Sequence, residues 1–317
     1  MASATYVGRL APSPTGALHL GNVRTFMIAW LRARSLGGRV VMRMEDLDHP
    51  RDKVGADAAA VADLRWLGFD WDEEYVQSKR KDLYREAISR LASAGLAYPC
   101  VCSRSDVEAA QSAPHEGEQL FYPGTCRGRF GSWEAAAKAI APRVPCWRFR
   151  TPEGAAGDVE FDDIFAGRFG QCVPRTLGDF PLARDEGGAG YTLAVVVDDA
   201  AMGVTEVVRG GDLLAATPAQ ILLQRALGLP MPKYCHVPLV VGHDGRRLAK
   251  RHGDTRVCAY RERGVAPERI IGMLAASCGW CAEGESHSLS SLIPRFTLAT
   301  IPHAPFTILS GSRFFAP

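Results

Sequence analysis

The sequence contains no run of about 20 consecutive apolar residues, the length that a membrane-spanning helix requires. Its first ten residues, MASATYVGRL, also lack the basic stretch followed by an apolar block that is typical of a secretory signal. We therefore expect no membrane partner and a cytoplasmic location. An excess of one charge is missing as well, because 37 Lys and Arg residues stand against 35 Asp and Glu residues. Bulk charge therefore does not predict nucleic-acid binding, and such a partner would have to meet a local patch.

The cysteines do not form the pattern of a disulfide framework. There are nine of them, an odd number, and they are scattered between positions 100 and 281. This usage is typical of a reducing compartment, so we expect the thiols to be reduced, buried or bound to a metal.

The first 46 residues predict a βαβ unit. An apolar run over 5–10 is typical of a buried strand, and apolar residues then recur at helical spacing from Val23 to Leu31. Gly37 and Gly38 provide a helix stop before a second apolar run at 40–45. Two parallel strands joined by a helix indicate an α/β fold, and we expect a Rossmann-like, doubly wound parallel sheet.

The whole chain divides into four segments that differ in composition and in apolar pattern. We expect the first half of a Rossmann-like catalytic domain, an inserted module rich in Gly, Pro and Cys, the second half of the catalytic domain, and a short helical C-terminal region. These segments are residues 1–96, 97–185, 186–256 and 257–317.

Individual elements are predicted within these segments from their apolar patterns. Helices are expected over 56–68, 79–96, 217–228 and 267–278. Strands are expected at 146–150 and 159–167, of an antiparallel type, and at 193–197 and 204–208, as continuous buried runs.

The loop between the first strand and its helix is the first candidate for a ligand site. In a doubly wound sheet it lies at the carboxyl edge, where ligands bind. The loop contains neither GxxxxGK[ST] nor GxGxxG, so a known phosphate loop is not indicated. It offers instead the N–H groups of a helix N-terminus beside the imidazole of His19, which could stabilise phosphate charge. The alternative is that His19 is a partly buried residue near a helix cap.

A basic loop at 241–254, VGHDGRRLAKRHGD, is the second candidate. A solvated surface loop is one interpretation. The other is that Lys250 neutralises charge on the pyrophosphate of a nucleotide.

These two loops carry a family resemblance. APSPTGALHLGN, residues 11–22, resembles the first signature of class I aminoacyl-tRNA synthetases in its glutamyl form, with HLGN where HIGH is usual. RLAKR, residues 247–251, resembles the second signature, KMSKS, with Lys250 at its second lysine. Arg247 keeps the charge of the first lysine, whereas Ala249 lacks the serine hydroxyl. RMEDLDHPR, YTLAVVVDDAAMGVTEVVRGGDLL and ERIIGMLAASCGW follow the glutamyl enzymes in the same order, so the resemblance spans nearly the whole chain.

The length of the chain narrows the resemblance. Only residues 252–317 follow the second signature, whereas full-length glutamyl enzymes continue into a helical anticodon-binding domain, which we expect to be absent here. The chain resembles the short paralogues of the family, which activate glutamate with ATP and attach it to the queuosine base in the anticodon of tRNA(Asp). The resemblance implies glutamate, ATP with Mg²⁺, and queuosine-containing tRNA(Asp) as partners. We expect a monomer.

The resemblance also implies the roles of individual residues. The catalytic residues would be His19 and Lys250. The glutamate contacts would be Arg9, Ala11, Ser13, Glu45, Tyr191 and Arg209, with Arg9 and Tyr191 near the side-chain carboxylate. The ATP contacts would be Pro12, His19, Gly21, Asn22, Arg247, Leu248 and Lys250. Chemistry agrees with the set, because an ammonium and two carboxylates need charged partners, but it does not assign each arginine to one carboxylate.

A structural zinc site is expected in the inserted module. Cys100, Cys102 and Cys126 provide three thiolates, and the residues alone would suggest His115 or Cys146 as the fourth ligand. This region instead resembles the short paralogues, which have Cys-x-Cys followed by Tyr-x-x-x-Cys. The resemblance implies Tyr122 as the fourth ligand. The alternative is three cysteines without a metal.

Three other functions stay open at this stage. A truncated glutamyl-tRNA synthetase would charge the tRNA 3′ end with help from another chain. A glutamate or nucleotide sensor on the same scaffold would bind without catalysis. A nucleotidyltransferase would activate another carboxylic acid.

Overall fold

The computed structural model describes residues 5–47, 54–109, 121–185, 188–246, 248 and 255–308. Its first sheet is the predicted βαβ unit extended by one strand: β1 (Val7–Leu10), β2 (Arg39–Met44) and β3 (Glu73–Val76) are parallel and lie in that order. Helix α1 (Leu20–Ser35) connects the first two strands, and α2 (Ala56–Trp66) precedes the third. Gly37 has a φ of +63° just after α1, which confirms the predicted helix stop.

A second sheet continues beside β1. Its strands lie in the order β7 (Gly167–Cys172), β6 (Asp158–Asp163), β10 (Lys233–Val237) and β9 (Glu206–Gly210). Strands β9 and β10 are parallel, as are β10 and β6. Thr205 joins the two sheets, because its backbone N–H donates to the Val7 carbonyl at 3.0 Å and its hydroxyl accepts from the Val7 N–H at 2.9 Å. The carboxyl ends of β1, β2 and β9 therefore meet at one edge.

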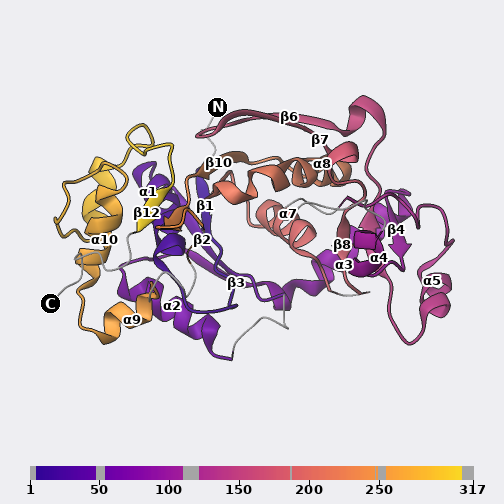
Figure 1. Ribbon diagram of the computed structural model, residues 1–317, viewed down its shortest axis with the longest axis horizontal. Coiled ribbons are helices and arrows are strands. Elements are labelled where there is room, and N and C mark those ends of the chain that lie inside the picture. Colours follow the sequence, from indigo (N-terminus) through magenta and orange to yellow (C-terminus); the bar gives the residue numbers. More distant parts are fainter. Residues whose placement is uncertain are drawn as a thin grey trace.

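Helices α3 (Lys81–Ser93), α7 (Tyr191–Ala201) and α8 (Thr217–Leu227) pack against one another beside this second sheet (Figure 1). The predicted strand at 193–197 is wrong, because these residues lie within α7. Leu193, Ala194, Val195 and Val196 are all buried, since helices and sheet enclose α7 on several sides. A continuous apolar run of this length has no periodicity that separates a buried helix from a buried strand.

The segment 97–185 contributes to two parts of the structure. Strands β4 (Ala97–Cys100), β5 (Cys146–Phe149) and β8 (Pro181–Ala183) form a small antiparallel sheet, with short helices α4 (Arg104–Ala109), α5 (Trp133–Ile140) and α6 (Val173–Thr176) nearby. The hairpin of β6 and β7 is antiparallel, as predicted, but it also pairs with β10. The boundary expected at residue 185 stays a prediction.

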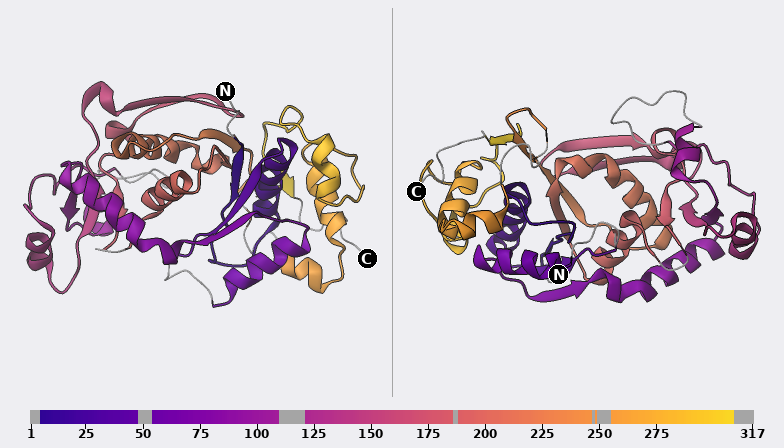
Figure 2. Two further views of the ribbon diagram at one scale, coloured as in Figure 1. Left: turned by 180° about the vertical axis from the view of Figure 1, so that it is seen from behind. Right: turned by 60° about the horizontal axis from the view of Figure 1, so that its bottom comes forward.

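The C-terminal region packs beside α1. It contains α9 (Val257–Glu262), α10 (Pro267–Ala276) and β12 (Phe306–Ile308), which pairs in parallel with β11 (Val240–Gly242) from the preceding segment. Ile270, Ile271 and Leu274 share one apolar core with α1, and Figure 2 shows α10 at the opposite end of the molecule from α5. Short 3₁₀ helices complete the fold at Gln77–Arg80, Gly154–Gly157, Gly211–Ala216 and Ser290–Arg295. Among the described residues, no helix has both the length and the apolar character needed to cross a membrane.

Candidate active site

A cleft of about 890 Å³ opens at the edge where β1, β2 and β9 end. It is lined by most of the residues that the sequence nominated for glutamate and ATP: Arg9, Ala11, Ser13, His19, Gly21, Asn22, Glu45, Tyr191, Arg209 and Leu248. Pro12 is a buried residue of the loop between β1 and α1, and its carbonyl accepts the Glu45 N–H at 2.9 Å. Arg247 and Lys250 lie outside the described residues. The fold thus brings residues 200 positions apart in sequence to one cavity.

His19 is the N-cap of α1. Its Nδ1 accepts the backbone N–H groups of Gly21 and Asn22 at 3.1 and 3.3 Å, while the Asn22 side chain accepts the His19 N–H at 3.2 Å. This reciprocal arrangement is a capping box. Because Nδ1 is an acceptor, the neutral ring carries its proton on Nε2. His19 is therefore a half-buried N-cap, and the same residue lines the cleft at the positive end of α1, so its role toward a ligand stays a prediction.

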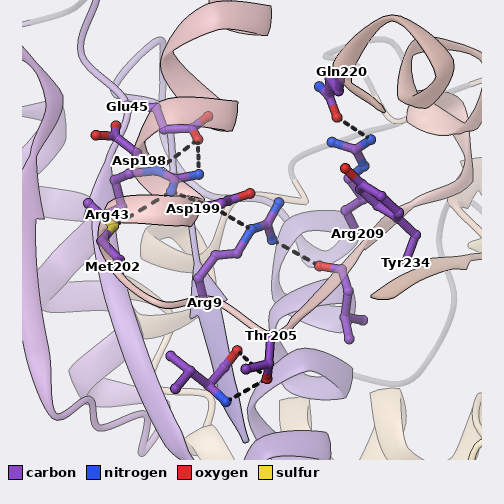
Figure 3. Close-up of polar contacts among 12 residues, drawn as sticks. Arg9, Arg43, Glu45, Asp198, Asp199, Met202, Thr205, Arg209, Gln220 and Tyr234 are labelled. Carbon is purple, nitrogen blue, oxygen red and sulfur yellow. Dashed lines mark hydrogen bonds and ion pairs between the residues drawn. The ribbon is translucent and has the colours of Figure 1, made fainter. Parts of the chain in front are cut away.

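Arg9 and Glu45 belong to one buried network of charges (Figure 3). The Arg9 guanidinium donates to the Val208 carbonyl at 3.1 Å, and its Nε lies 3.6 Å from Oδ1 of Asp199. Burial lowers the pKa of Arg9, although Asp199 opposes this effect. Burial also raises the pKa of Glu45, and the neighbouring arginines oppose that shift. A carboxylate enclosed in this way suits an ammonium ligand, which would replace its lost hydration.

Arg43 organises this network, although no sequence motif gave it a role. Its side chain is fully buried and donates to Asp199 at 2.5 Å and to Glu45 at 3.0 Å. Burial opposes the charged form, yet Asp199 and Glu45 outweigh it and raise the pKa of Arg43. The available signal was its position in β2, two residues before Glu45, because residues two apart face the same side of a strand.

Arg209 is bound differently from the other two arginines. It is 4% exposed, and its guanidinium donates to His236 at 2.9 Å and to Thr217 and Gln220 at 2.8 Å each. A longer contact of 3.4 Å reaches the hydroxyl of Tyr191. Among the described residues, no carboxylate lies within 4 Å of Arg209. A buried cation without a counterion is costly, so this site favours an anionic ligand.

Tyr191 lies at the first position of α7 and is 43% exposed within the cleft. Enclosure by the cleft raises the pKa of Tyr191, so its hydroxyl stays protonated and can donate to a ligand. The direct contact joins Tyr191 to Arg209, on the β9 side of the cleft.

The predicted metal ligands come together at the far end of the molecule. The Tyr122 hydroxyl lies 3.2 Å from Sγ of Cys100 and 3.6 Å from Sγ of Cys102, which in turn lies 3.6 Å from Sγ of Cys126. A tetrahedral zinc ion with Zn–S bonds of about 2.3 Å holds its sulfur ligands about 3.8 Å apart. The Cys102–Cys126 separation is close to this value, and all three sulfurs lie within 4.8 Å of one another, so the donor set suits a zinc ion. Burial raises the pKa of Tyr122, so a cation would be needed to release its proton.

Of the two other candidates for the fourth ligand, Cys146 packs against this cluster without joining the three sulfurs. Cys146 lies opposite Cys100 in the register of β4 and β5 but is not among the three sulfurs that lie within 4.8 Å of one another. His115 lies outside the described residues. Arg148 completes the surroundings, because its Nε donates to Sγ of Cys100 at 3.2 Å and its guanidinium lies 3.8 Å from the centre of the Tyr122 ring.

Comparison with known proteins places these features in a family context. The family model of the class I tRNA synthetases (E and Q), catalytic domain, matches residues 6–294. The chain is 48% identical over 314 residues to a glutamyl-Q tRNA(Asp) synthetase of Symbiobacterium thermophilum, covering 95% of each chain. It is also 40% identical over 301 residues to a glutamate–tRNA ligase of Aquifex aeolicus, covering 94% of this chain and 63% of the ligase.

A solved structure supports the same assignment. The crystal structure of a glutamate tRNA ligase from Elizabethkingia meningosepticum in complex with its amino acid superposes with a TM-score of 0.80 at 28% identity. The match covers 97% of this chain and 68% of that ligase.

Proposed function

The chain belongs to the class I tRNA synthetases of the glutamate and glutamine type, and within them to the glutamyl-Q tRNA(Asp) synthetases, and on this premise we propose that it activates glutamate with ATP and transfers it to queuosine in the anticodon of tRNA(Asp). The observation that carries the proposal is the cleft itself. It combines the buried guanidinium groups of Arg9 and Arg209, an enclosed carboxylate and the capped N-terminus of α1 in one cavity.

Glutamate binding follows from the charges of the cleft. Glu45 would accept hydrogen bonds from the ammonium group, and Arg209 would hold a carboxylate in its otherwise uncompensated positive site. Arg9 would bind the other carboxylate, while Ala11, Ser13 and Tyr191 would contact the ligand from the same cleft. Each charged group of the amino acid would thus meet a desolvated partner.

Activation would occur beside α1. An oxygen of the glutamate α-carboxylate attacks the α-phosphorus of ATP, the bond to the bridging oxygen breaks, and pyrophosphate leaves. The ring N–H of His19 and the backbone N–H groups at the start of α1 would stabilise the added negative charge, together with Lys250 and the Mg²⁺ that accompanies ATP. Pro12, Gly21, Asn22, Arg247 and Leu248 would form the rest of the ATP site. No protein nucleophile is required.

Transfer would complete the reaction. A hydroxyl oxygen of the queuosine attacks the glutamyl carbonyl carbon, the bond to AMP breaks, and the hydroxyl proton passes to the released phosphate. The base would enter the cleft as a splayed nucleotide of the anticodon loop. We expect the protein to act as a monomer in the cytoplasm, where glutamate, ATP and tRNA occur together.

The cysteine cluster would hold a structural zinc ion. Cys100, Cys102, Tyr122 and Cys126 would fill four tetrahedral positions, which is typical of a closed structural site. The segment 97–185 would then be a zinc-containing inserted module, and residues 1–96 and 186–256 the two halves of the catalytic domain.

Amino-acid-dependent exchange between ATP and pyrophosphate tests the activation step. We expect glutamate to drive exchange, whereas glutamine should be much weaker because its neutral amide leaves a buried guanidinium unpaired. The assay needs arms with and without tRNA. Glutamate binding without exchange in either arm would support a sensor, and stronger exchange with another acid would support a different nucleotidyltransferase.

A further inference from the structure

Arg209 is oriented by a neutral acceptor. Its Nε donates to Nε2 of His236 at 2.9 Å, and the two residues face each other directly in the register of β9 and β10. Arginine has no acceptor atom, so Nε2 of His236 must be the unprotonated nitrogen. The ring proton then lies on Nδ1.

Asp163 fixes this tautomer from the other side. Oδ2 of Asp163 lies 2.6 Å from Nδ1 of His236, and both side chains are fully buried. Oδ1 of Asp163 accepts the backbone N–H groups of His236, Phe165 and Ala166 at 3.0, 3.0 and 2.8 Å. The carboxylate is therefore held in place, and only Oδ2 is left to face the ring.

This arrangement contrasts with that of the other buried arginines in the cleft. Arg43 contacts two carboxylates and Arg9 lies near one, so their charges are partly compensated within the protein. Arg209 instead donates its orienting hydrogen bond to the imidazole of His236. The negative charge of Asp163 lies on the far side of that ring and does not contact Arg209. A carboxylate at position 236 would pair with Arg209 and compete with an incoming anion.

We infer that His236, oriented by Asp163, is a positioning residue that holds Arg209 for the substrate carboxylate without compensating its positive charge. The inference rests on the proposed function, because it takes glutamate as the anion. It also gives the β6–β7 hairpin a role in the site, since Asp163 is the last residue of β6.

Two substitutions at His236 separate the two hydrogen bonds. His236→Gln places an acceptor where Nε2 was and keeps the bond to Arg209. His236→Asn places a donor where Nδ1 was, keeps the bond to Asp163, and leaves Nε of Arg209 without an acceptor. Because an unsatisfied buried donor is costly, we expect His236→Asn to raise the KM for glutamate about tenfold and His236→Gln to raise it less than about threefold. The KM for ATP should stay within about twofold in both.

Asp163→Asn provides a second variant of almost unchanged shape. Its amide oxygen must stay on the three backbone N–H groups, so its NH₂ faces Nδ1 and drives the ring proton to Nε2, against Arg209. The KM for glutamate should again rise about tenfold. Tyr234→Phe is the matched control, because Tyr234 lies on β10 as His236 does. The substitution removes the buried hydrogen bond of 2.9 Å that Gln224 donates to the Tyr234 hydroxyl. It leaves the hydrogen bonds that connect Asp163, His236 and Arg209 intact.

The outcomes are distinct. Equal glutamate KM values in His236→Asn, Asp163→Asn and the unmodified protein would overturn the inference, as would a parallel rise in the KM for ATP or an equal rise in Tyr234→Phe. If glutamate drove no exchange in the unmodified protein, the proposed function would fail first, and the role of Arg209 with it.

Discussion

Replacing Arg209 by Gln removes the one buried cation of the cleft that has no carboxylate partner among the described residues. Gln can still meet one of the neutral partners, Thr217 or Gln220, so the wall of the cleft is retained while the charge is lost. Removing one member of a buried, hydrogen-bonded charge pair costs about 2–5 kcal/mol. At about 1.4 kcal/mol per factor of ten, we expect kcat/KM for glutamate to fall by a factor of about 30 to several thousand.

The assay is glutamate-dependent exchange between ATP and pyrophosphate, with both substrates varied. We expect the loss to be confined to glutamate, because none of the described residues assigned to ATP is a hydrogen-bond partner of Arg209. Arg32→Gln is the matched control. It removes a half-buried ion pair of 2.9 Å with Glu206, which lies at the start of β9 and not in the cleft. A KM for glutamate within threefold of the unmodified protein, or equal losses in both variants, would refute the assignment of Arg209.

Four further predictions test other parts of the account. His19→Asn keeps a good N-cap but removes the ring N–H, so thermal stability should hardly change while exchange falls at least about a hundredfold; retained exchange would leave His19 with a capping role alone. Lys250→Ala should lower exchange by orders of magnitude, and unchanged exchange would refute its assignment to the pyrophosphate. Tyr122→Phe should weaken zinc binding about tenfold or more in competition with a chromogenic chelator, and equal affinity would exclude the phenol as a ligand. Burial lowers the pKa of His236, so below about pH 6.5 the unfolded chain binds a proton that the folded chain does not. The free energy of unfolding should therefore decrease as the pH is lowered. Urea unfolding at pH 7.5 and 5.5 should show a smaller decrease for His236→Gln than for the unmodified protein.

The sequence predicted the elements whose signals are local. The first strand, its helix and the second strand were predicted because apolar periodicity and Gly37 act within a few residues. Helix α7 was missed because its apolar run is buried on several sides, which is a property of the fold and not of the run. The pairing of β6 with β10 was also out of reach, because it joins segments about 70 residues apart.

The site shows the same division. Arg9, Glu45 and Arg209 could be nominated from motifs, and the fold does place them in one cleft. Their partners could not be found in this way. Arg43 and Asp199 are 156 residues apart in sequence, and His236 faces Arg209 only through the register of two strands. Motifs therefore indicate which groups meet the ligand, whereas the groups that orient them depend on strand pairing and helix placement.

The site of attachment on the RNA tests the central claim most directly. The protein would be incubated with labelled glutamate, ATP, Mg²⁺ and tRNA(Asp), with and without queuosine, and the tRNA would then be cleaved into anticodon and acceptor fragments. We predict label in the anticodon fragment, and only when queuosine is present. Label on the 3′-terminal ribose, independent of queuosine, would contradict it and would identify a glutamyl-tRNA synthetase activity instead.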